Sequence, residues 1–241
     1  MPEETVHVAA FPGQDPAFLT EQEAMLDPLW RAAMEAEMAL LNKHHTYEEV
    51  PADAGDKVLG YRWVYTIKYD SSGKEVKRKA RIVARGFAQT ADEYRESFAP
   101  VVSQNSWRVL VALSATQGWT KSKLDVRSAY LNSRLDVPMK MKLPLIVNSR
   151  DKVAKLLGNL YGLHQGANLW HGDIVEFLQS LGFHQSPSDP CVFIRRTTGL
   201  SVIALHVDDL SIFASDPALH DEIVAAIRKR FEVATGPLDT Y

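Results

Sequence analysis

The chain has 241 residues, of which 46% are hydrophobic and 24% are charged, and this ordinary globular usage excludes a wholly disordered or collagen-like chain. Its formal net charge of -3 is too small to indicate a nucleic-acid-binding protein by itself. Its one cysteine, Cys191, excludes an internal disulfide and favours an intracellular, reducing compartment, without distinguishing a cytoplasmic particle from the nucleus. No apolar run approaches the ~18 residues that a membrane-spanning helix needs, so no membrane partner is expected.

The charge is unevenly distributed along the chain. Residues 1–55 carry eleven acids and two bases, residues 56–85 carry nine bases and three acids, and residues 86–241 carry sixteen of each. A polyanion interacts with the charge of the segment that it contacts rather than with the net charge of the whole chain. The basic segment 56–85 is therefore a candidate contact for phosphate. A solvated charged face is the alternative interpretation.

The first elements in chain order are expected to be helices. Residues 1–19 are expected to be irregular, because several prolines interrupt them. Thr20 and Glu23 predict a capping box. Asp27 and Pro28 predict the start of a second helix, since the apolar residues that follow recur at helical spacing.

Two strands joined by a turn are expected next. Residues 58–69 are rich in aromatic and β-branched side chains, residues 70–73 are typical of a turn, and residues 75–85 can return as a second strand. Because side chains alternate along a strand, the second strand would place four of its bases on one face, namely Lys77, Lys79, Arg81 and Arg85. A basic strand face on a hairpin is a candidate phosphate clamp.

Helices and short strands alternate in the rest of the chain. The patterns predict helices at 103–117, 167–181 and 217–231, and strands at 119–126, 191–194, 200–207 and 210–214. Mixed antiparallel strands and helices indicate an α+β fold.

Two aspartates separate two apolar strands. Asp208 and Asp209 stand where a two-residue hairpin loop is expected, and a plain turn is one interpretation because Asp favours turns. The other interpretation is a metal site, because Mg²⁺ prefers carboxylate oxygens. Asp125, at the end of another apolar strand, is the candidate for a further carboxylate, with a helix N-cap as the alternative. Carboxylates on facing strands can hold two metal ions that serve an attacking and a leaving oxygen.

Other chemistries lack their motifs in this sequence. There is no G-x-x-x-x-G-K-[ST], no G-x-G-x-x-G and no G-x-S-x-G. The histidines form no zinc pattern with the single cysteine. His206, between apolar strands, is expected to be a partly buried side chain.

Six blocks in one order give the chain its resemblance to a known family. They lie at 30–51, 79–89, 96–102, 124–132, 160–165 and 206–209, and include KARIVARGFAQ at 79–89, LDVRSAYLN at 124–132 and HVDD at 206–209. In this order they resemble the reverse transcriptase domain of Ty1/copia-type LTR retrotransposons, from about residue 30 to about residue 236.

The resemblance implies a polymerase fold and an activity. The fold would be an α+β palm-and-fingers core with an antiparallel sheet and packed helices, a single domain at 20–241 with fingers at about 44–118 and palm at about 119–241. The activity would be that of an RNA-directed DNA polymerase, a two-metal nucleotidyl transfer from a dNTP to a primer 3′-hydroxyl. Its partners would be an RNA or DNA template with its primer, and dNTPs.

The resemblance also implies roles for individual residues. The catalytic carboxylates would be Asp125, Asp208 and Asp209. Two Mg²⁺ ions, or Mn²⁺, would be held by Asp125, the backbone carbonyl of Val126, Asp208 and Asp209. Nucleotide-binding residues would be Lys79, Arg81, Arg85, Tyr130 and Gln165. Of these, Arg81 is our first choice for the triphosphate, Tyr130 would lie under the sugar, and Gln165 would contact the nucleotide or template. From the residues alone, without the motif, a core aromatic is the preferred interpretation of Tyr130.

The sequence departs from the family pattern at three places. His206 stands where an aromatic residue is usual, and residues 133–137 lack the usual Gly and gain Arg134. The sequence ends at Tyr241, where the family continues into the primer grip, the thumb and RNase H, and the RNase H and integrase segments of a parent polyprotein are absent. The alternative to an enzyme is therefore a non-catalytic truncated remnant that at most binds nucleic acid. A gene fragment that yields no stable protein is a third possibility.

Overall fold

The computed structural model describes residues 16–149 and 151–236, which form two compact units. The first unit takes the described residues within 1–96 and 130–166, and the second takes those within 97–129 and 167–241. Helices and antiparallel strands occur in both, which confirms the α+β class. The expected fingers and palm ranges stay a prediction. None of the helices in the described part of the chain is long and apolar enough to cross a membrane.

Two capped helices open the first unit. Thr20 and Glu23 form the predicted capping box at the start of α1 (Glu21–Leu26). Asp27 caps α2 (Pro28–Lys43) by accepting hydrogen bonds from the amides of Leu29 and Trp30. Of the segment expected to be irregular, residues 1–15 lie outside the described residues, and η1 (Pro16–Phe18) is a short 3₁₀ helix.

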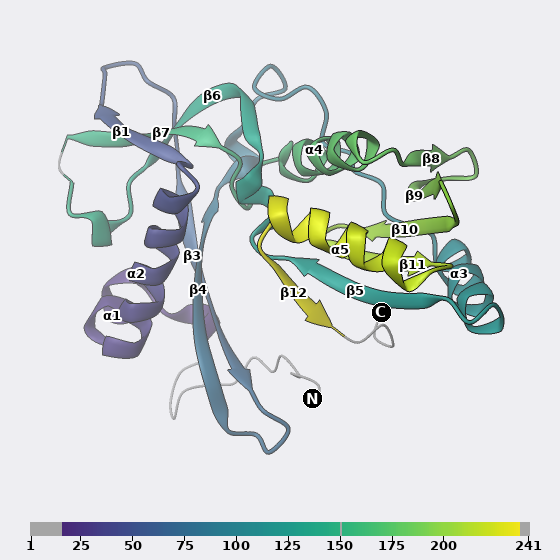
Figure 1. The fold of residues 1–241 in the computed structure, drawn as a ribbon. Coiled ribbons are helices and arrows are strands. Elements are labelled where there is room, and N and C mark those ends of the chain that lie inside the picture. Colours follow the sequence, from purple (N-terminus) through teal and green to yellow (C-terminus); the bar gives the residue numbers. More distant parts are fainter. Residues whose placement is uncertain (1–15, 150, 237–241) are drawn as a thin grey trace. The chain divides into compact units, whose positions relative to one another are not determined.

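A two-stranded hairpin lies against α2. It consists of β3 (Tyr61–Tyr69) and β4 (Glu75–Ala84), and in Figure 1 it runs beside α2 and extends beyond it. The alternation predicted for the second strand is confirmed from Lys77 to Val83, because the intervening Ala80, Ile82 and Ala84 are buried. The prediction is wrong for Arg85, which lies one residue beyond the strand, where η2 (Gly86–Ala88) turns the chain.

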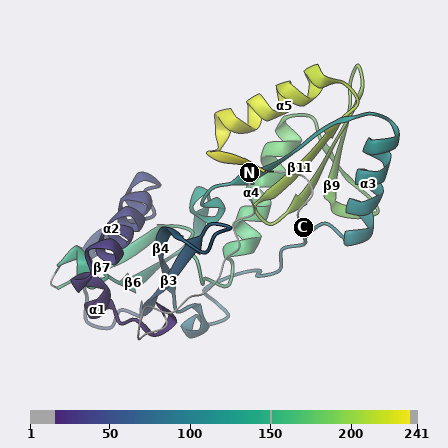
Figure 2. The ribbon, with the colours of Figure 1, turned by 90° about the horizontal axis from the view of Figure 1, so that it is seen from below.

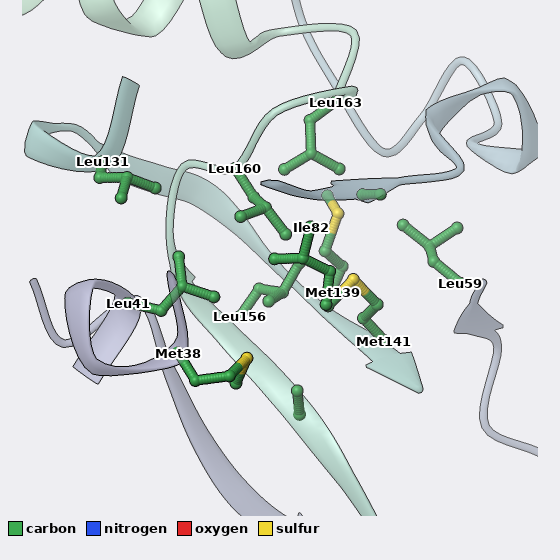
Figure 3. Close-up of a cluster of buried hydrophobic side chains, with 12 residues drawn as sticks. Met38, Leu41, Leu59, Ile82, Leu131, Met139, Met141, Leu156, Leu160 and Leu163 are labelled. Carbon is green, nitrogen blue, oxygen red and sulfur yellow. The ribbon is translucent and has the colours of Figure 1, made fainter. Parts of the chain in front are cut away.

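A four-stranded sheet completes the first unit. Its strands follow the order β1 (Tyr47–Pro51), β7 (Lys152–Gly158), β6 (Arg134–Lys142) and β2 (Val58–Leu59). The expected single strand at 58–69 is therefore wrong, because Gly60 separates β2 from β3 and β2 pairs in parallel with β6 instead. Figure 3 shows the core that results, in which side chains from α2, β4, β6 and β7 meet, among them Met38, Leu41, Ile82, Met139, Met141 and Leu156.

The second unit is built on a six-stranded antiparallel sheet. The strand order is β12 (Val233–Gly236), β5 (Thr120–Val126), β11 (Asp209–Ala214), β10 (Leu200–His206), β9 (Asp189–Arg196) and β8 (His184–Ser186). Its helices are α3 (Gln104–Thr116), α4 (Gly166–Ser180) and α5 (Pro217–Arg230), which confirms the three predicted helices to within about a residue at each end. Two further 3₁₀ helices are η3 (Ala129–Asn132), whose first residue is the last of a second-unit stretch and whose other residues belong to the first unit, and η4 (Leu145–Val147), which belongs to the first unit.

The two faces of this sheet have different neighbours. Ser122 of β5 shares a hydrogen bond of 2.8 Å with His220 of α5, so α5 covers the face that carries Ser122 and Leu124. Trp107 of α3 donates to the Ser211 hydroxyl at 3.4 Å on the other face. Figures 1 and 2 show α5 to one side of the strands. The odd-numbered side chains at the end of β5, including Asp125, therefore lie on the face away from α5.

Candidate active site

A tight turn between β10 and β11 carries the first of the predicted carboxylates. His206 pairs with Asp209, so the two loop residues are Val207 and Asp208. The predicted loop of Asp208 and Asp209 is thus wrong by one residue, because Asp209 is already the first residue of β11. Val207 has φ +57°. Two-residue hairpin loops demand positive φ, which costs a non-glycine residue roughly 1–2 kcal/mol.

Neighbouring elements of the same unit hold this turn in place. The indole N–H of Trp170 on α4 donates to the Val207 carbonyl at 2.7 Å, and the Val126 amide donates to the Asp208 carbonyl at 2.8 Å. Trp170 is itself buried and lies edge-on to Phe231 at 5.4 Å between ring centroids. Each hydrogen bond is worth ~1 kcal/mol, which is comparable with the backbone strain at Val207.

The three predicted carboxylates gather at one end of β5 and β11. Asp209 lies directly opposite Asp125 in the strand register. Burial raises the pKa of Asp208, and the nearby charges of Asp125 and Asp209 raise it further, against the lowering effects of its own backbone amide and of His206. Because Asp125 is the penultimate residue of a strand and no α-helix follows it directly, its interpretation as a helix N-cap is wrong. His206 is half-buried, as predicted.

A lysine that sequence reasoning missed lies beside these carboxylates. The Lys123 ammonium is 2.9 Å from the Asp209 carboxylate, and 14% and 23% of the two side chains are exposed. Lys123 stands two residues before Asp125 on β5, so strand alternation places both on one face. This spacing could have indicated from the sequence that Lys123 lies on the same face as Asp125. Its ion-pair partner, Asp209, follows only from the register of β5 with β11.

The carboxylates of this site offer few donors to a divalent metal ion. No group of three or more His, Cys, Asp or Glu residues within 16–149 and 151–236 is arranged to hold one. Mg²⁺, however, is usually bound through one or two carboxylates, with water and substrate phosphates completing its shell. Asp125 and Asp208 supply such a pair, and a cation would offset the burial and the neighbouring negative charges that together raise the pKa of Asp208. The carboxylates therefore fit a Mg²⁺ or Mn²⁺ ion, while the role of the Val126 carbonyl stays a prediction.

Two of the predicted nucleotide-binding residues meet around one tyrosine in the first unit. The Arg81 guanidinium lies 5.3 Å from the Tyr161 ring centroid, and the Tyr161 and Tyr130 rings are 5.5 Å apart. Lys79, also on β4, is half-buried, and burial together with the Arg81 charge lowers its pKa. Tyr130 is half-buried in η3 and its ring contacts that of Tyr161, and its role at the sugar stays a prediction.

Arg85 borders a hollow in the surface of the first unit. The hollow has a volume of about 490 Å³ and is lined by Arg62, Arg85 and Phe87 among others, with Phe87 80% exposed. Ala84, Gly86 and Gly162 also line it, and the Ala84 amide donates to the Tyr161 carbonyl at 2.8 Å. A β-carbon at Gly86 would collide with the Gly162 carbonyl oxygen, and one at Gly162 would collide with the Ala84 carbonyl oxygen, so the end of β4 and the start of η2 touch the loop at 161–162 directly.

Gln165 is buried rather than exposed at the surface. Its side-chain oxygen accepts from the Gln89 amide group at 2.9 Å, and the Gln89 oxygen accepts from the His164 backbone amide at 2.9 Å. The Gln165 side-chain nitrogen has no hydrogen-bond partner in the part of the chain that the structure describes. A buried donor of this kind calls for an acceptor. Gln89 was not predicted as a site residue, although it ends the block at 79–89.

Comparison with known proteins decides the family. Residues 44–241 match the family described as Reverse transcriptase (RNA-dependent DNA polymerase). The chain belongs to this family.

The relatives of this reverse transcriptase domain are transposon polyproteins. It is 32% identical over 220 residues to the Retrovirus-related Pol polyprotein from transposon RE1 of Arabidopsis thaliana, which covers 89% of this chain and 15% of the relative. It is 32% identical over 207 residues to that from transposon TNT 1-94 of Nicotiana tabacum, with 83% and 16% covered. The Transposon Ty1-DR5 Gag-Pol polyprotein of Saccharomyces cerevisiae is 26% identical over 178 residues, with 73% and 10% covered. The resemblance to the Ty1/copia type is confirmed, and the chain spans about a sixth of the plant relatives.

Two solved foamy virus structures are also similar to the chain. The native protease-reverse transcriptase of prototype foamy virus has a TM-score of 0.43 and 15% identity, covering 87% of this chain and 24% of that one. The foamy viral protease-reverse transcriptase dRH in complex with double-stranded DNA has a TM-score of 0.49 and 14% identity, covering 97% and 34%.

The predicted site residues of the reverse transcriptase domain thus fall into two sets. Asp125, Val126, Asp208 and Asp209 come together in the second unit. Lys79, Arg81, Arg85, Tyr130 and Gln165 belong to the first unit. In the first unit, Arg81 and Tyr130 both contact the ring of Tyr161. Arg85 instead borders the hollow, and Gln165 is hydrogen-bonded to Gln89.

Proposed function

We propose that this reverse transcriptase domain transfers a nucleotidyl group from a dNTP to a primer 3′-hydroxyl, directed by an RNA or DNA template. The observation that carries the proposal is the gathering of three carboxylates at one end of β5 and β11, with Asp209 opposite Asp125 and Asp208 in the adjoining turn. The primer oxygen attacks the α-phosphorus, a new phosphodiester bond forms, and pyrophosphate leaves.

In this proposal the second unit provides the chemistry. Asp125 and Asp208 are the ligands that would hold two Mg²⁺ or Mn²⁺ ions, and Asp209, which the sequence also predicted as a ligand, assists them. When bound, such ions activate the attacking hydroxyl and offset the charge of the leaving pyrophosphate. The hydrogen bonds from Trp170 and Val126 to the turn keep the Asp208 carboxylate in a fixed position.

In the same proposal the first unit binds the nucleotide. Arg81 binds the triphosphate, with Lys79 and Arg85 as further cations, because charge-assisted hydrogen bonds to phosphate are strong. Tyr130 lies under the sugar and selects against a 2′-hydroxyl by contact with it. The unpaired buried donor of Gln165 supports its assignment to the nucleotide or template.

The hollow beside Arg85 is proposed to receive a template strand. It combines two arginines with an exposed aromatic side chain, Phe87. Single-stranded nucleic acids are bound by this combination, in which cations contact the backbone and rings stack on bases.

Substitution of the carboxylates tests the proposed activity. Purified residues 1–241 are given a primed RNA template and dNTPs, first with Mg²⁺ and then with Mn²⁺. Asp208→Asn and Asp125→Asn should each lower primer extension by a factor on the order of 10² or more, since each removes a charge that binds the metal. The matched control is Asp221→Asn on α5, because the Asp221 side chain is 81% exposed on the other side of the sheet.

The outcomes separate the enzyme from a remnant. Extension by the wild-type protein and by Asp221→Asn, but not by the two site variants, supports the proposal. Full activity in Asp208→Asn would refute the carboxylate assignment. If the wild-type chain binds the primed template with a steep salt dependence but never extends it, a non-catalytic domain that binds nucleic acid is the better description.

A further inference from the structure

Lys123 and Asp209 form a diagonal pair across two neighbouring strands. Asp209 is opposite Asp125, and Ser211 is opposite Lys123, so all four side chains lie on one face of the sheet. Diagonal neighbours in an antiparallel pair are within reach of a long side chain such as lysine. Register and alternation therefore dictate this contact, and no special loop geometry is needed for it.

The pair is sheltered from solvent as well as close. Its two charged atoms are 2.9 Å apart, and only 14% of Lys123 and 23% of Asp209 are exposed. Exposed ion pairs are weak because water screens them, whereas a sheltered pair holds its geometry. The ammonium neutralises the Asp209 carboxylate and occupies one of its oxygens.

The neighbouring carboxylates are placed differently. The Asp208 carboxylate is at the turn, where the Asp125 and Asp209 charges act on it, and Asp125 is exposed. These two offer oxygens to a cation, while the Asp209 carboxylate faces a cation that the protein itself supplies. The three aspartates are therefore not equivalent.

We propose that Lys123 is a positioning residue that keeps the Asp209 carboxylate bound to its own ammonium group, so that Asp125 and Asp208 carry the divalent metal and Asp209 does not ligate it. This inference rests on the proposed function and refines it. Because the intact Lys123–Asp209 pair has no net charge, we expect it to change the affinity for the metal only when one of the two partners is removed.

Mn²⁺ affinity, measured without nucleotide, is the readout. Free Mn²⁺ is followed by electron paramagnetic resonance during titration of the full chain at constant ionic strength, and circular dichroism verifies the fold of each variant. Lys123→Gln frees the Asp209 carboxylate and should tighten Mn²⁺ binding by about threefold to tenfold. Lys123→Met is a second neutral replacement should the first not fold.

The double variant is the decisive measurement. Lys123→Gln with Asp209→Asn replaces a neutral ion pair by a neutral amide pair, and its Mn²⁺ affinity should stay within about twofold of the wild type. The matched control is Lys121→Gln, which removes a charge from an exposed lysine two residues earlier on β5 and should change the affinity by less than about twofold.

Two results would overturn the inference while leaving the proposed function intact. The first is a double variant that loses Mn²⁺ as severely as Asp208→Asn does, because Asp209 would then be a ligand. The second is Lys121→Gln tightening the binding as much as Lys123→Gln, because general charge would then explain the effect. If Asp208→Asn binds Mn²⁺ as well as the wild type, the metal site itself is wrong and both proposals fall.

Discussion

Glu37 is a carboxylic acid in the buried part of the first unit. It is 5% exposed, and its carboxylate accepts a long hydrogen bond of 3.4 Å from the Ile82 amide. Burial raises the pKa of Glu37, although that hydrogen bond and the charges of Lys79 and Arg81 oppose the rise. The carboxylate therefore ionises less readily in the folded chain than in the unfolded one.

The sign of this shift predicts a pH dependence of stability. A folded pKa above the unfolded value means that the ionised carboxylate weakens the fold at high pH, and that this cost disappears as the pH falls through the folded pKa. Glu37→Gln, which has the same size and no charge, should be more stable than the wild type at pH 8, and the difference should shrink toward the ordinary glutamate pKa of 4.5. Urea unfolding at several pH values measures it, and a difference that grows on acidification would contradict the assignment.

At the scale of elements, one residue joins α2 to the hairpin. Asp27 accepts from the Leu29 amide at 2.8 Å and forms an ion pair with Arg78 of β4 at 2.8 Å. Arg78 also lies over the Trp30 ring at 5.1 Å. The N-cap of the helix is thus also a contact between two elements.

Removal of this cap should destabilise the protein measurably. Asp27→Ala loses the cap and the ion pair, and we expect it to lower the free energy of unfolding by about 1–2 kcal/mol. Asp27→Asn keeps the capping oxygen and loses the charge, so it should cost less than half as much. Urea denaturation compares the three proteins, and equal losses in both variants would assign the whole effect to the ion pair.

Element prediction succeeded where a local signal was strong. The caps at Thr20 and Asp27 were predicted, because these side chains bond to amides a few residues away, and the helix α3 was predicted from the helical spacing of its residues. The strands β6 and β7 were missed, since β6 is rich in Lys, Asp and Pro, which are depleted in strands and hide the alternation of its inward methionines. Asp209 was assigned to the loop because a turn type is fixed by register rather than by composition.

The prediction of the candidate site was limited in the same way, because it depended on local sequence patterns. The aspartates were found through motifs that resemble a family, and their meeting follows from the pairing of β5 with β11. Lys123 and Gln89 were missed because their partners, Asp209 and Gln165, are far away in sequence. Such contacts follow from tertiary structure, which no local pattern encodes.

At the scale of the whole molecule, the chain is interleaved between the two units. It leaves the first unit after Glu96, returns at Tyr130 and leaves again after Gly166. The late return supplies β6 and β7, which pair with β2 and β1 from the early part of the chain. The first unit therefore needs both stretches for its sheet and core.

Fragments should reveal this dependence. Residues 1–118 contain β1 and β2 without their partners, so they should show no cooperative unfolding transition. A chain in which residues 1–96 are joined by a flexible linker to residues 130–166 should unfold cooperatively, because the sheet and the core in Figure 3 are restored. Circular dichroism during urea titration distinguishes them, and cooperative unfolding of residues 1–118 alone would contradict the dependence.

The contact between Gly86 and Gly162 has a consequence for the inheritance of this sequence. Neither position admits a β-carbon, because each would meet a backbone oxygen of the other segment. The block that contains Arg81 and the block that contains Gln165 are therefore under one steric constraint, although many residues separate them. A recombination between two members of the family that exchanges one block should therefore preserve this contact only where both parents carry glycine at the two positions, because any other residue would bring a β-carbon into the backbone of the other segment.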